Sequence, residues 1–479
     1  MVIEQLEFGQ ALAGLLVDES EETPYVGATL TLDDVRGVLV EIPFFAGDET
    51  GQFMHVQDWF DSRTPPSNLL FQSVKGPISL FDLRWNGHSS PSGLAAGRGT
   101  FRAGETVLGH RLGPLADQLE IQQVRSWLDQ LNDWAGLTSM TTNFASDPDN
   151  HTSRAHSFTV NLTTDEPVTW EQGAATLTLK STWRSTREDD RRGRRLLVVD
   201  DVVLDSSFPE PRRFEDHLVE QRKLTNLLVL LYGVRIALRR HRLRDDRFVD
   251  NAGSAQFVDL LSASTIRERA RPMPEVKDRP IAHLEQVGPD GLTTWAENYE
   301  SWKRFILPAV NTFGRPDMLA EEVVMSTFTS IEAASHKIGK RRGEDSTYRR
   351  GRVTTATHAY RCLHLLGISW PVQIASIEGM AQAIANNYNT IKHADRGEFP
   401  DPRESILVSQ MNRWIIRLLA VHLTGKGDSV LGDHRSGTTK LWKLEQTFDT
   451  YQLRITSDGV WMTGGSTEAE TLPRDRGGA

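Results

Sequence analysis

Short alternating runs of apolar and polar residues dominate the first 210 positions of the chain. A period of two predicts β-strands that bury one face. The clearest runs cover residues 37–43, 68–75, 78–84, 156–162, 175–183 and 195–204. The last two flank arginines interleaved with Glu188, Asp189 and Asp190. This cluster has two interpretations: a solvated hairpin tip of mixed charge, or an arm that contacts RNA phosphates.

Residues 119–134 interrupt the alternating pattern. Val124, Trp127, Leu128 and Leu131 stand at positions i, i+3, i+4 and i+7, which is the spacing of one helical face. The segment therefore predicts a helix whose tryptophan packs onto the sheet.

A helical period returns over residues 214–243, where leucines recur on one side. The end of this predicted helix is basic and includes Arg239, Arg240 and Arg242. Cations stabilise a helix C-terminus through the macrodipole, and they also bind RNA phosphates, so both roles are open. Residues 268–292 are rich in proline and charge, which predicts a linker.

The chain after Trp295 is predominantly helical in period. The pattern predicts long helices over residues 318–338, 353–366, 372–392 and 404–423. Antiparallel helices joined by short or polar loops form a bundle. Towards the end, residues 440–445 and 451–456 predict a pair of strands, and the apolar-poor segment 464–479 predicts a disordered tail.

These patterns predict an α+β multidomain protein with a β-rich N-terminal domain and packed helices, followed by an all-α helix bundle. The expected boundaries are 1–210 for the β-rich domain, 211–292 for a helical extension and linker, 293–427 for the bundle, and 428–479 for short strands and the tail.

Composition narrows the possible classes of protein. The 479 residues carry a formal net charge of −10, which excludes a uniformly basic nucleic-acid coat but allows a local basic groove. One cysteine, Cys362, excludes a disulfide within the chain and a cysteine-cluster zinc site. The sequence lacks the roughly 18 consecutive apolar residues of a membrane span, so we expect a cytoplasmic protein without a membrane partner.

Common cofactor and nucleophile motifs are missing from the sequence. It contains no Gly-x-Gly-x-x-Gly, no phosphate loop ending in Gly-Lys-Ser/Thr, no His-Glu-x-x-His and no Gly-x-Ser-x-Gly. His358 and His364 lie six residues apart, which does not place them on one helical face. We therefore expect neither a cofactor nor a metal ion.

One polar cluster stands at the end of the predicted helix over residues 372–392. Asn386, Asn387 and Asn389 precede Lys392 and His393, and Asp395 and Arg396 follow. Asparagine is a poor helix-interior residue because its side chain competes for backbone hydrogen bonds. The cluster is either a helix C-cap and turn, or a polar site at a helix end, and the residues alone leave both open.

An asparagine-rich helix end that closes with Lys-His inside a helix bundle resembles the HEPN domain (higher eukaryotes and prokaryotes nucleotide-binding). The whole layout resembles the ApeA family of bacterial anti-phage proteins, which pairs a β-rich N-terminal domain with a HEPN domain. The matching N-terminal features are Leu39-Val-Glu-Ile-Pro-Phe, Gly76-Pro-Ile-Ser-Leu-Phe, Val124-Arg-Ser-Trp-Leu and Arg213-Phe-Glu.

The resemblance implies a metal-independent ribonuclease. Active HEPN domains carry an Arg followed by a polar residue, and four to six residues separate the Arg from a His. His393 matches the His and Asn387 the polar residue, whereas Asn386 stands where the Arg should be. In this interpretation His393 transfers protons, Asn386 and Asn387 position the phosphate or the His, and Lys392 supplies charge. Glu332 of the predicted helix over residues 318–338 either faces this site as well or is a plain surface or capping carboxylate.

Two hypotheses follow. In the first, infection provides a phage-derived trigger, and a homodimer or higher oligomer formed through the bundle cuts host RNA. The family resemblance implies that this RNA is tRNA. In the second, the bundle is catalytically inactive and binds RNA, a nucleotide or a partner protein. In either case Arg396, Arg239, Arg240 and Arg242 are candidate RNA-binding residues.

Overall fold

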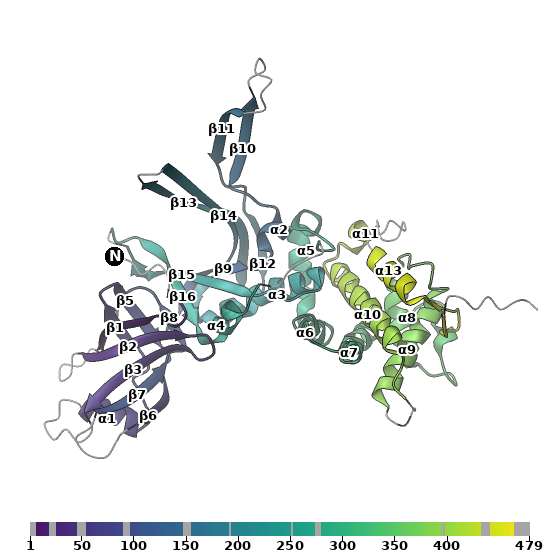
Figure 1. The fold of residues 1–479 in the computed structure, drawn as a ribbon, viewed down its shortest axis with the longest axis horizontal. Coiled ribbons are helices and arrows are strands. Elements are labelled where there is room, and N and C mark those ends of the chain that lie inside the picture. Colours follow the sequence, from purple (N-terminus) through teal and green to yellow (C-terminus); the bar gives the residue numbers. More distant parts are fainter. Residues whose placement is uncertain are drawn as a thin grey trace, which may run out of the picture. The chain divides into compact units, whose positions relative to one another are not determined.

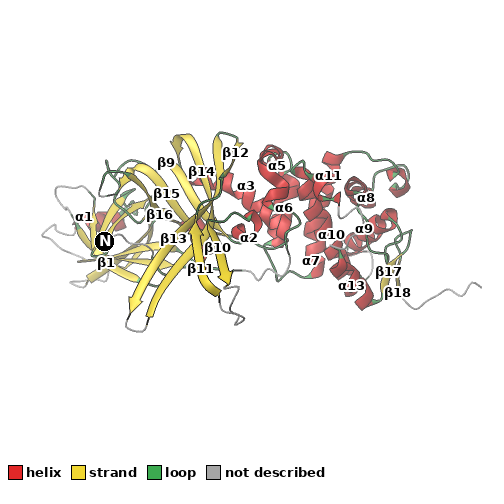
Figure 2. Ribbon diagram, turned by 90° about the horizontal axis from the view of Figure 1, so that it is seen from above, coloured by secondary structure: helices red, strands yellow, loops and turns green. Residues whose placement is uncertain are grey.

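The computed structural model describes residues 6–18, 25–45, 54–89, 96–146, 155–190, 193–250, 252–273, 279–393, 395, 398–432 and 441–463. The chain forms two compact units: Met1–Thr225 with Ile236–Glu275, and Asn226–Arg235 with Val276–Ala479. The first unit holds a large sheet, and the second holds most of the helices (Figure 2). This arrangement confirms the predicted α+β multidomain class.

Within the described residues, one antiparallel 14-stranded sheet dominates the first unit (Figure 1). Its order is β12-β13-β14-β9-β15-β16-β8-β5-β4-β1-β2-β3-β7-β6. The strands are β1 (Ala11–Val17), β2 (Val26–Asp33), β3 (Gly37–Phe45), β4 (Leu69–Ser73), β5 (Gly76–Phe81), β6 (Arg84–Ser89), β7 (Ala96–Arg102), β8 (Glu105–Val107), β9 (Ile121–Leu128), β12 (Val168–Gln172), β13 (Ala175–Asp190), β14 (Gly193–Arg212), β15 (Leu238–Val249) and β16 (Ala255–Ser262).

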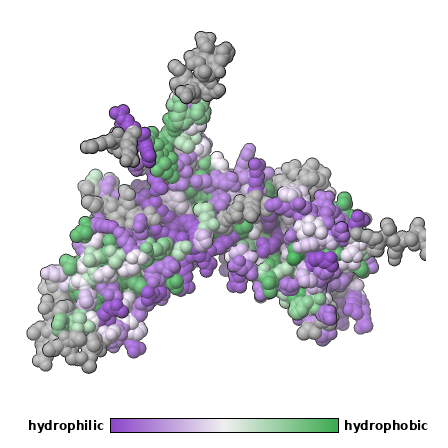
Figure 3. Space-filling view, in the orientation of Figure 1, coloured by the Kyte–Doolittle hydropathy of each residue, from purple (hydrophilic) through white to green (hydrophobic). Residues whose placement is uncertain are grey.

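A separate hairpin is made by β10 (Met140–Ser146) and β11 (Ala155–Leu162). Phe144 and Phe158 face one another across it, with ring centroids 4.8 Å apart. They are 71% and 56% exposed, and Figure 3 shows hydrophobic residues along this hairpin. The hairpin therefore presents aromatic surface to solvent.

The core formed around strands β1 to β7 is completed by α1 (Met54–Asp61) and α4 (Ala263–Ala270). Phe60 of α1 is fully buried and lies directly against Gly99 of β7. A Cβ atom at position 99 would stand 2.0 Å from the Phe60 ring. Only glycine leaves room for this ring over the strand, which fixes the approach of α1 to the sheet.

Helix α3 (Phe214–Tyr232) is joined to the sheet by buried polar contacts. Gln221 donates from Nε2 to the carbonyl of Val124 (3.1 Å) and accepts from Ser126 Oγ (2.5 Å). Ser126 Oγ also lies 2.8 Å from Nδ1 of His241 in β15. Burial lowers the pKa of His241 to about 3, so its ring is neutral.

Two helix predictions are wrong. Residues 119–134 hold β9 and the short helix α2 (Leu131–Ala135), and the end of the predicted helix 214–243 lies in β15. Both strands bury polar side chains on their inner face: Ser126 in β9, and His241 and Asp245 in β15. These polar residues conceal the period of two, so the remaining apolar residues imitate a helical spacing.

The second unit is built around helices. They are α5 (Leu284–Tyr299), α6 (Lys303–Phe313), α7 (Ala320–Ile338), the 3₁₀ helix η1 (Glu344–Thr347), α8 (Thr355–Leu366), α9 (Ile377–Lys392), α10 (Pro402–Leu423), α11 (Gly427–Val430) and α13 (Trp442–Tyr451). The predicted helices over 318–338, 353–366, 372–392 and 404–423 are confirmed as α7 to α10. The third begins later than expected because the hydroxyl of Ser376 caps it by accepting from Gly379 N.

Two further segments differ from expectation. The predicted linker 268–292 overlaps the end of α4 and the start of α5, and α5 is kinked at Gly288, where φ is 64°. In the described residues after 440, the predicted first strand is instead part of α13. The strand pair is formed by β17 (Leu453–Ile455) and β18 (Trp461–Thr463). The predicted tail 464–479 lies outside the described residues.

The helices of the second unit also share buried polar contacts. Asn412 of α10 donates from Nδ2 to Thr327 Oγ1 of α7 (3.1 Å). Arg417 donates from a terminal guanidinium nitrogen to the carbonyl of Leu231 (2.7 Å), which seats the end of α3 beside α10. None of the described helices is long and apolar enough to cross a membrane.

Candidate functional site

The C-terminal half of α9 and its C-cap carry the predicted catalytic residues. Helix α9 is held by buried apolar side chains along one side, among them Met380 and Ile384. It ends at Lys392, and His393 forms the C-cap with extended backbone angles. The N–H of His393 donates to the carbonyl of Asn389 (3.1 Å). The polar cluster is thus a helix end, as the sequence indicated.

The two neighbouring asparagines point in different directions. Asn386 is exposed and accepts a hydrogen bond from Gln382 Nε2 (2.7 Å). Asn387 is 3% exposed, and its Nδ2 lies 3.4 Å from Ser405 Oγ of α10. Among the described residues, no donor reaches the Asn387 Oδ1 atom. Asn386 therefore faces solvent, whereas Asn387 lies between helices.

Lys392 stands beside an aromatic stack, and His393 follows it in the chain. Lys392 is exposed, and its Nζ lies 5.3 Å from the ring centroid of Tyr388. Tyr388 stacks in turn on Phe328 of α7, with centroids 4.3 Å apart. His393 is half-buried. The structure therefore places one ammonium group and one imidazole on the same turn of the helix, and Arg396 lies outside the described residues.

The predicted RNA-binding arginines of β15 are held by carboxylates and carbonyls. Arg239 makes a two-pronged ion pair with buried Asp129, at 2.7 and 2.8 Å. Arg240 does the same with Asp259, at 2.6 and 2.9 Å. Arg242 donates to the carbonyl of Phe257. These contacts give the three guanidinium groups a structural role in the sheet, with part of each side chain still open to solvent.

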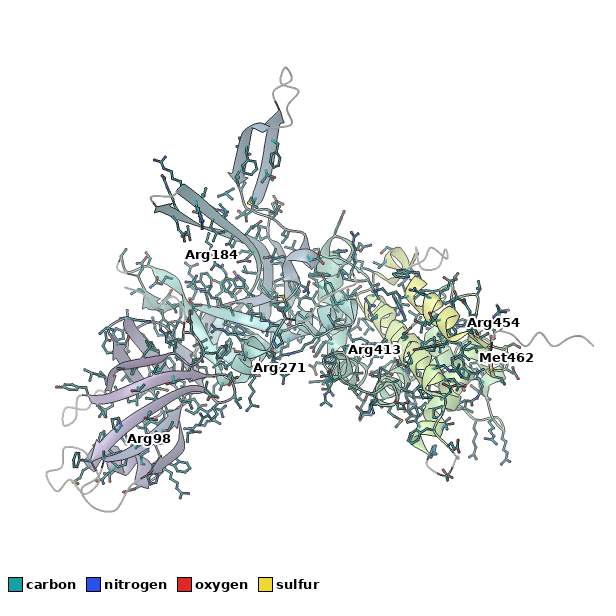
Figure 4. The ribbon with its side chains drawn as sticks, in the orientation of Figure 1. Arg98, Arg184, Arg271, Arg413, Arg454 and Met462 are labelled. Carbon is teal, nitrogen blue, oxygen red and sulfur yellow. The ribbon has the colours of Figure 1, made fainter. Side chains whose placement is uncertain are left out.

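A cavity of about 430 Å³ lies over β9, β13, β15 and β16. It is lined by Trp127, Trp183 and Phe257 and by the side chains of Arg240, Arg242 and Arg184, the last labelled on β13 in Figure 4. Asp201 and Asp259 also border it. Aromatic rings with guanidinium groups are the usual lining of sites for flat, anionic ligands such as nucleotides.

A second titratable cluster, absent from the sequence prediction, joins α7 and α8. Glu332, His336 and His358 each offer a ligand atom within 4.8 Å of the others. Burial lowers the pKa of His358, Glu332 raises it, and His336 lowers it further. The sequence signal was the Glu332–His336 spacing of four, which puts both on one helical face. The third member of the cluster is His358. From the sequence, His358 was compared only with His364 of the same predicted helix.

Glu332 and His336 also line a cavity of about 700 Å³ between α6 and α7. Arg304 and Lys337 add positive charge to this cavity, and Trp302 adds an aromatic ring. Glu332 therefore lines this cavity and lies near His358. The hypothesis that Glu332 faces the end of α9 has no recorded contact to support it among the described residues.

Comparison with known proteins bears on the N-terminal unit. No curated protein and no solved structure matches the chain significantly. Residues 16–248 match the family model described as ApeA N-terminal domain 1. This match spans β2 to nearly the end of β15 and stops before the helices that carry the candidate site. Residues 16–248 are therefore similar to the N-terminal domain of ApeA proteins.

Proposed function

We propose that this protein is a HEPN-type endoribonuclease of anti-phage defence, which cuts host RNA, tRNA foremost, in the cytoplasm when a phage-derived trigger binds. One observation carries the proposal. In a chain whose residues 16–248 resemble an ApeA N-terminal domain, α9 ends with Lys392 and His393 side by side in the chain, and Asn386 lies nearly two turns earlier on the same helix. This placement is supported by the packing of α9 against α7, α8 and α10.

Metal-independent RNA cleavage needs a base for the 2′-hydroxyl, an acid for the leaving oxygen and positive charge near the phosphorane. His393 supplies the imidazole that exchanges protons near neutral pH. Exposed Lys392 supplies charge, and exposed Asn386 supplies amide donors for a phosphate oxygen. Buried Asn387 acts indirectly, by holding α9 against Ser405 of α10.

A single α9 end provides one imidazole, whereas acid–base cleavage uses two proton-transfer groups. We propose that a second copy of the chain brings its own α9 end to the first, through the helical unit. The homodimer then supplies two His393 side chains and two Lys392 side chains to one RNA strand. The two Lys392 side chains then supply the positive charge that the family motif obtains from an arginine, in whose place this chain has Asn386.

The test is a cleavage assay with the full chain, total tRNA and EDTA, with and without phage lysate. Wild-type protein is expected to yield 2′,3′-cyclic phosphate ends. The His393→Ala variant should lose at least a hundredfold in rate, as expected for removal of an acid–base group. His364→Ala, which changes a histidine of α8 that lies outside the α9 cluster, is the matched control and should cleave normally.

The alternative is a catalytically inactive protein that binds RNA or a nucleotide. The cavity over β13 and β15, with its aromatic rings and arginines, favours this reading. The same assay separates the two functions. Binding of tRNA with no cleavage, even with phage lysate present, would support the alternative and overturn the nuclease.

A further inference from the structure

Helices α7 and α8 bring three metal-ligand side chains together from distant parts of the sequence. Glu332 and His336 lie one turn apart on α7, and His358 comes from α8. The imidazole rings of His336 and His358 have centroids 4.9 Å apart. Oε1 of Glu332 lies 4.0 Å from Nε2 of His358.

The hydrogen bonds around Ser335 orient the His358 ring. Ser335 Oγ donates to the carbonyl of Glu332 (2.8 Å), so its lone pair accepts from Nδ1–H of His358 (2.5 Å). The protonated nitrogen is then Nδ1, and Nε2 carries a free lone pair. The Nε2 atom that carries this lone pair lies 4.0 Å from the Glu332 carboxylate oxygen. Because both atoms are electron-pair donors, a cation between them would be attracted to both.

We propose that Glu332, His336 and His358 bind one divalent transition-metal ion, of which Zn²⁺ is the best fit. Two imidazoles and one carboxylate are a common three-ligand set for zinc. Tetrahedral zinc with bonds of about 2.0–2.1 Å places its ligands roughly 3.4 Å apart. Glu332 is 48% exposed and His336 is exposed, so both side chains can close the remaining distance by rotation.

The surroundings fit an open metal site. Ser335 acts on His358 as an outer-shell partner, which in metal sites fixes the ligating nitrogen and its direction. Three protein ligands leave a fourth position for water or an anionic oxygen. The adjoining cavity carries Arg304 and Lys337, which suit an anionic oxygen at that position. The ion would also join α7 to α8.

The test uses untagged full-length protein that has been stripped with a chelator and dialysed. Zn²⁺ binding is measured by competition with a chromophoric chelator, and Co²⁺ binding by its visible absorption. We expect one ion per chain. His336→Ala and Glu332→Gln should each weaken binding at least tenfold, and Ser335→Ala should weaken it by about tenfold to a hundredfold through the His358 ring. Circular dichroism checks that each variant is folded.

His364→Ala is the matched control, because it removes another histidine from α8 outside the cluster. It should bind like the wild type. The proposal is overturned if stripped wild-type protein takes up no stoichiometric ion, if His336→Ala binds equally well, or if His364→Ala weakens binding as much as His336→Ala does. These measurements use no RNA, so their outcome is independent of the proposed nuclease activity.

Discussion

At the residue scale, one buried ion pair connects the short helix η1 to α8. Arg361 donates two hydrogen bonds to Glu344, each 2.8 Å long, and Glu344 is fully buried. Tyr348 donates to the same carboxylate, as does the backbone N–H of Arg341 (2.8 Å). With these four donors the buried charge is fully compensated, so loss of the guanidinium should cost far more than loss of an exposed partner.

Removal of the guanidinium should destabilise the protein strongly. Arg361→Met leaves the Glu344 carboxylate buried without its cation, which costs about 3–5 kcal/mol of unfolding free energy. Lys340→Ala is the matched control, since the Lys340–Asp345 pair spans 3.2 Å and is 66% and 68% exposed. Its loss should leave the stability nearly unchanged, because solvent screens an exposed pair. Urea unfolding measures both, and equal losses would contradict the argument.

The same carboxylate gives a pH signature. The bonds from Arg361 lower the pKa of Glu344 from 4.5 to about 2. A lowered folded-state pKa stabilises the protein above the unfolded value, and this contribution is lost as the pH falls from about 4.5 to 2. Glu344→Gln should therefore show a flatter loss of stability across this window than wild type. Parallel pH curves for the two proteins would contradict this origin.

At the scale of elements, helices and strands were predicted correctly where the repeat of apolar residues alone is enough to reveal the element. Helices α7 to α10 bury apolar faces and were found from the sequence. Strands β9 and β15 were missed because Ser126, His241 and Asp245 occupy inward positions. Ser126 meets Gln221 and His241 only after β9, β15 and α3 have come together, so its burial cannot be seen in a single segment.

The candidate sites also contain features that the sequence revealed and features that depend on helix packing. The α9 end was visible because three asparagines near a helix terminus contradict local propensity. The inward turn of Asn387 towards Ser405 was not visible, because it depends on α10. The meeting of His336 with His358 depends equally on the packing of α7 against α8.

The packing of α1 onto β7 should not tolerate a side chain at position 99. Gly99→Ala places a methyl group inside the ring of Phe60, so the helix or the ring must shift, at a cost of about 1–3 kcal/mol or more. Gly27 of β2 is the control, because a Cβ there meets no atom within 4 Å. Gly27→Ala should be neutral or slightly stabilising. Thermal unfolding of the two variants tests the contrast, and equal melting temperatures would refute it.

At the scale of the whole molecule, the two compact units alternate along the chain. Residues 226–235 belong to the helical unit, and Ile236–Glu275 return to the sheet unit. The returning segment supplies β15 and β16, which stand between β9 and β8 in the sheet. The sheet is therefore continuous only when this segment is present.

Fragments with different ends should behave differently for this reason. A fragment of residues 1–235 leaves β9 and β8 each with an unpaired edge, and unpaired edges promote aggregation. A fragment of residues 1–275 completes the sheet and should remain monodisperse. Size-exclusion chromatography compares the two, with the full chain as reference. A monodisperse 1–235 fragment with native strand content would show that β15 and β16 are dispensable.

The same interruption sets a delay during synthesis on the ribosome. Strand β9 ends at Leu128, and its partner β15 ends at Val249, about 120 residues later. At about 5–20 residues per second, translation of that interval takes roughly 6 to 24 s. Throughout this time the nascent sheet keeps an open edge beside β9. A chaperone that covers strand edges would therefore act on this protein before its helical unit exists.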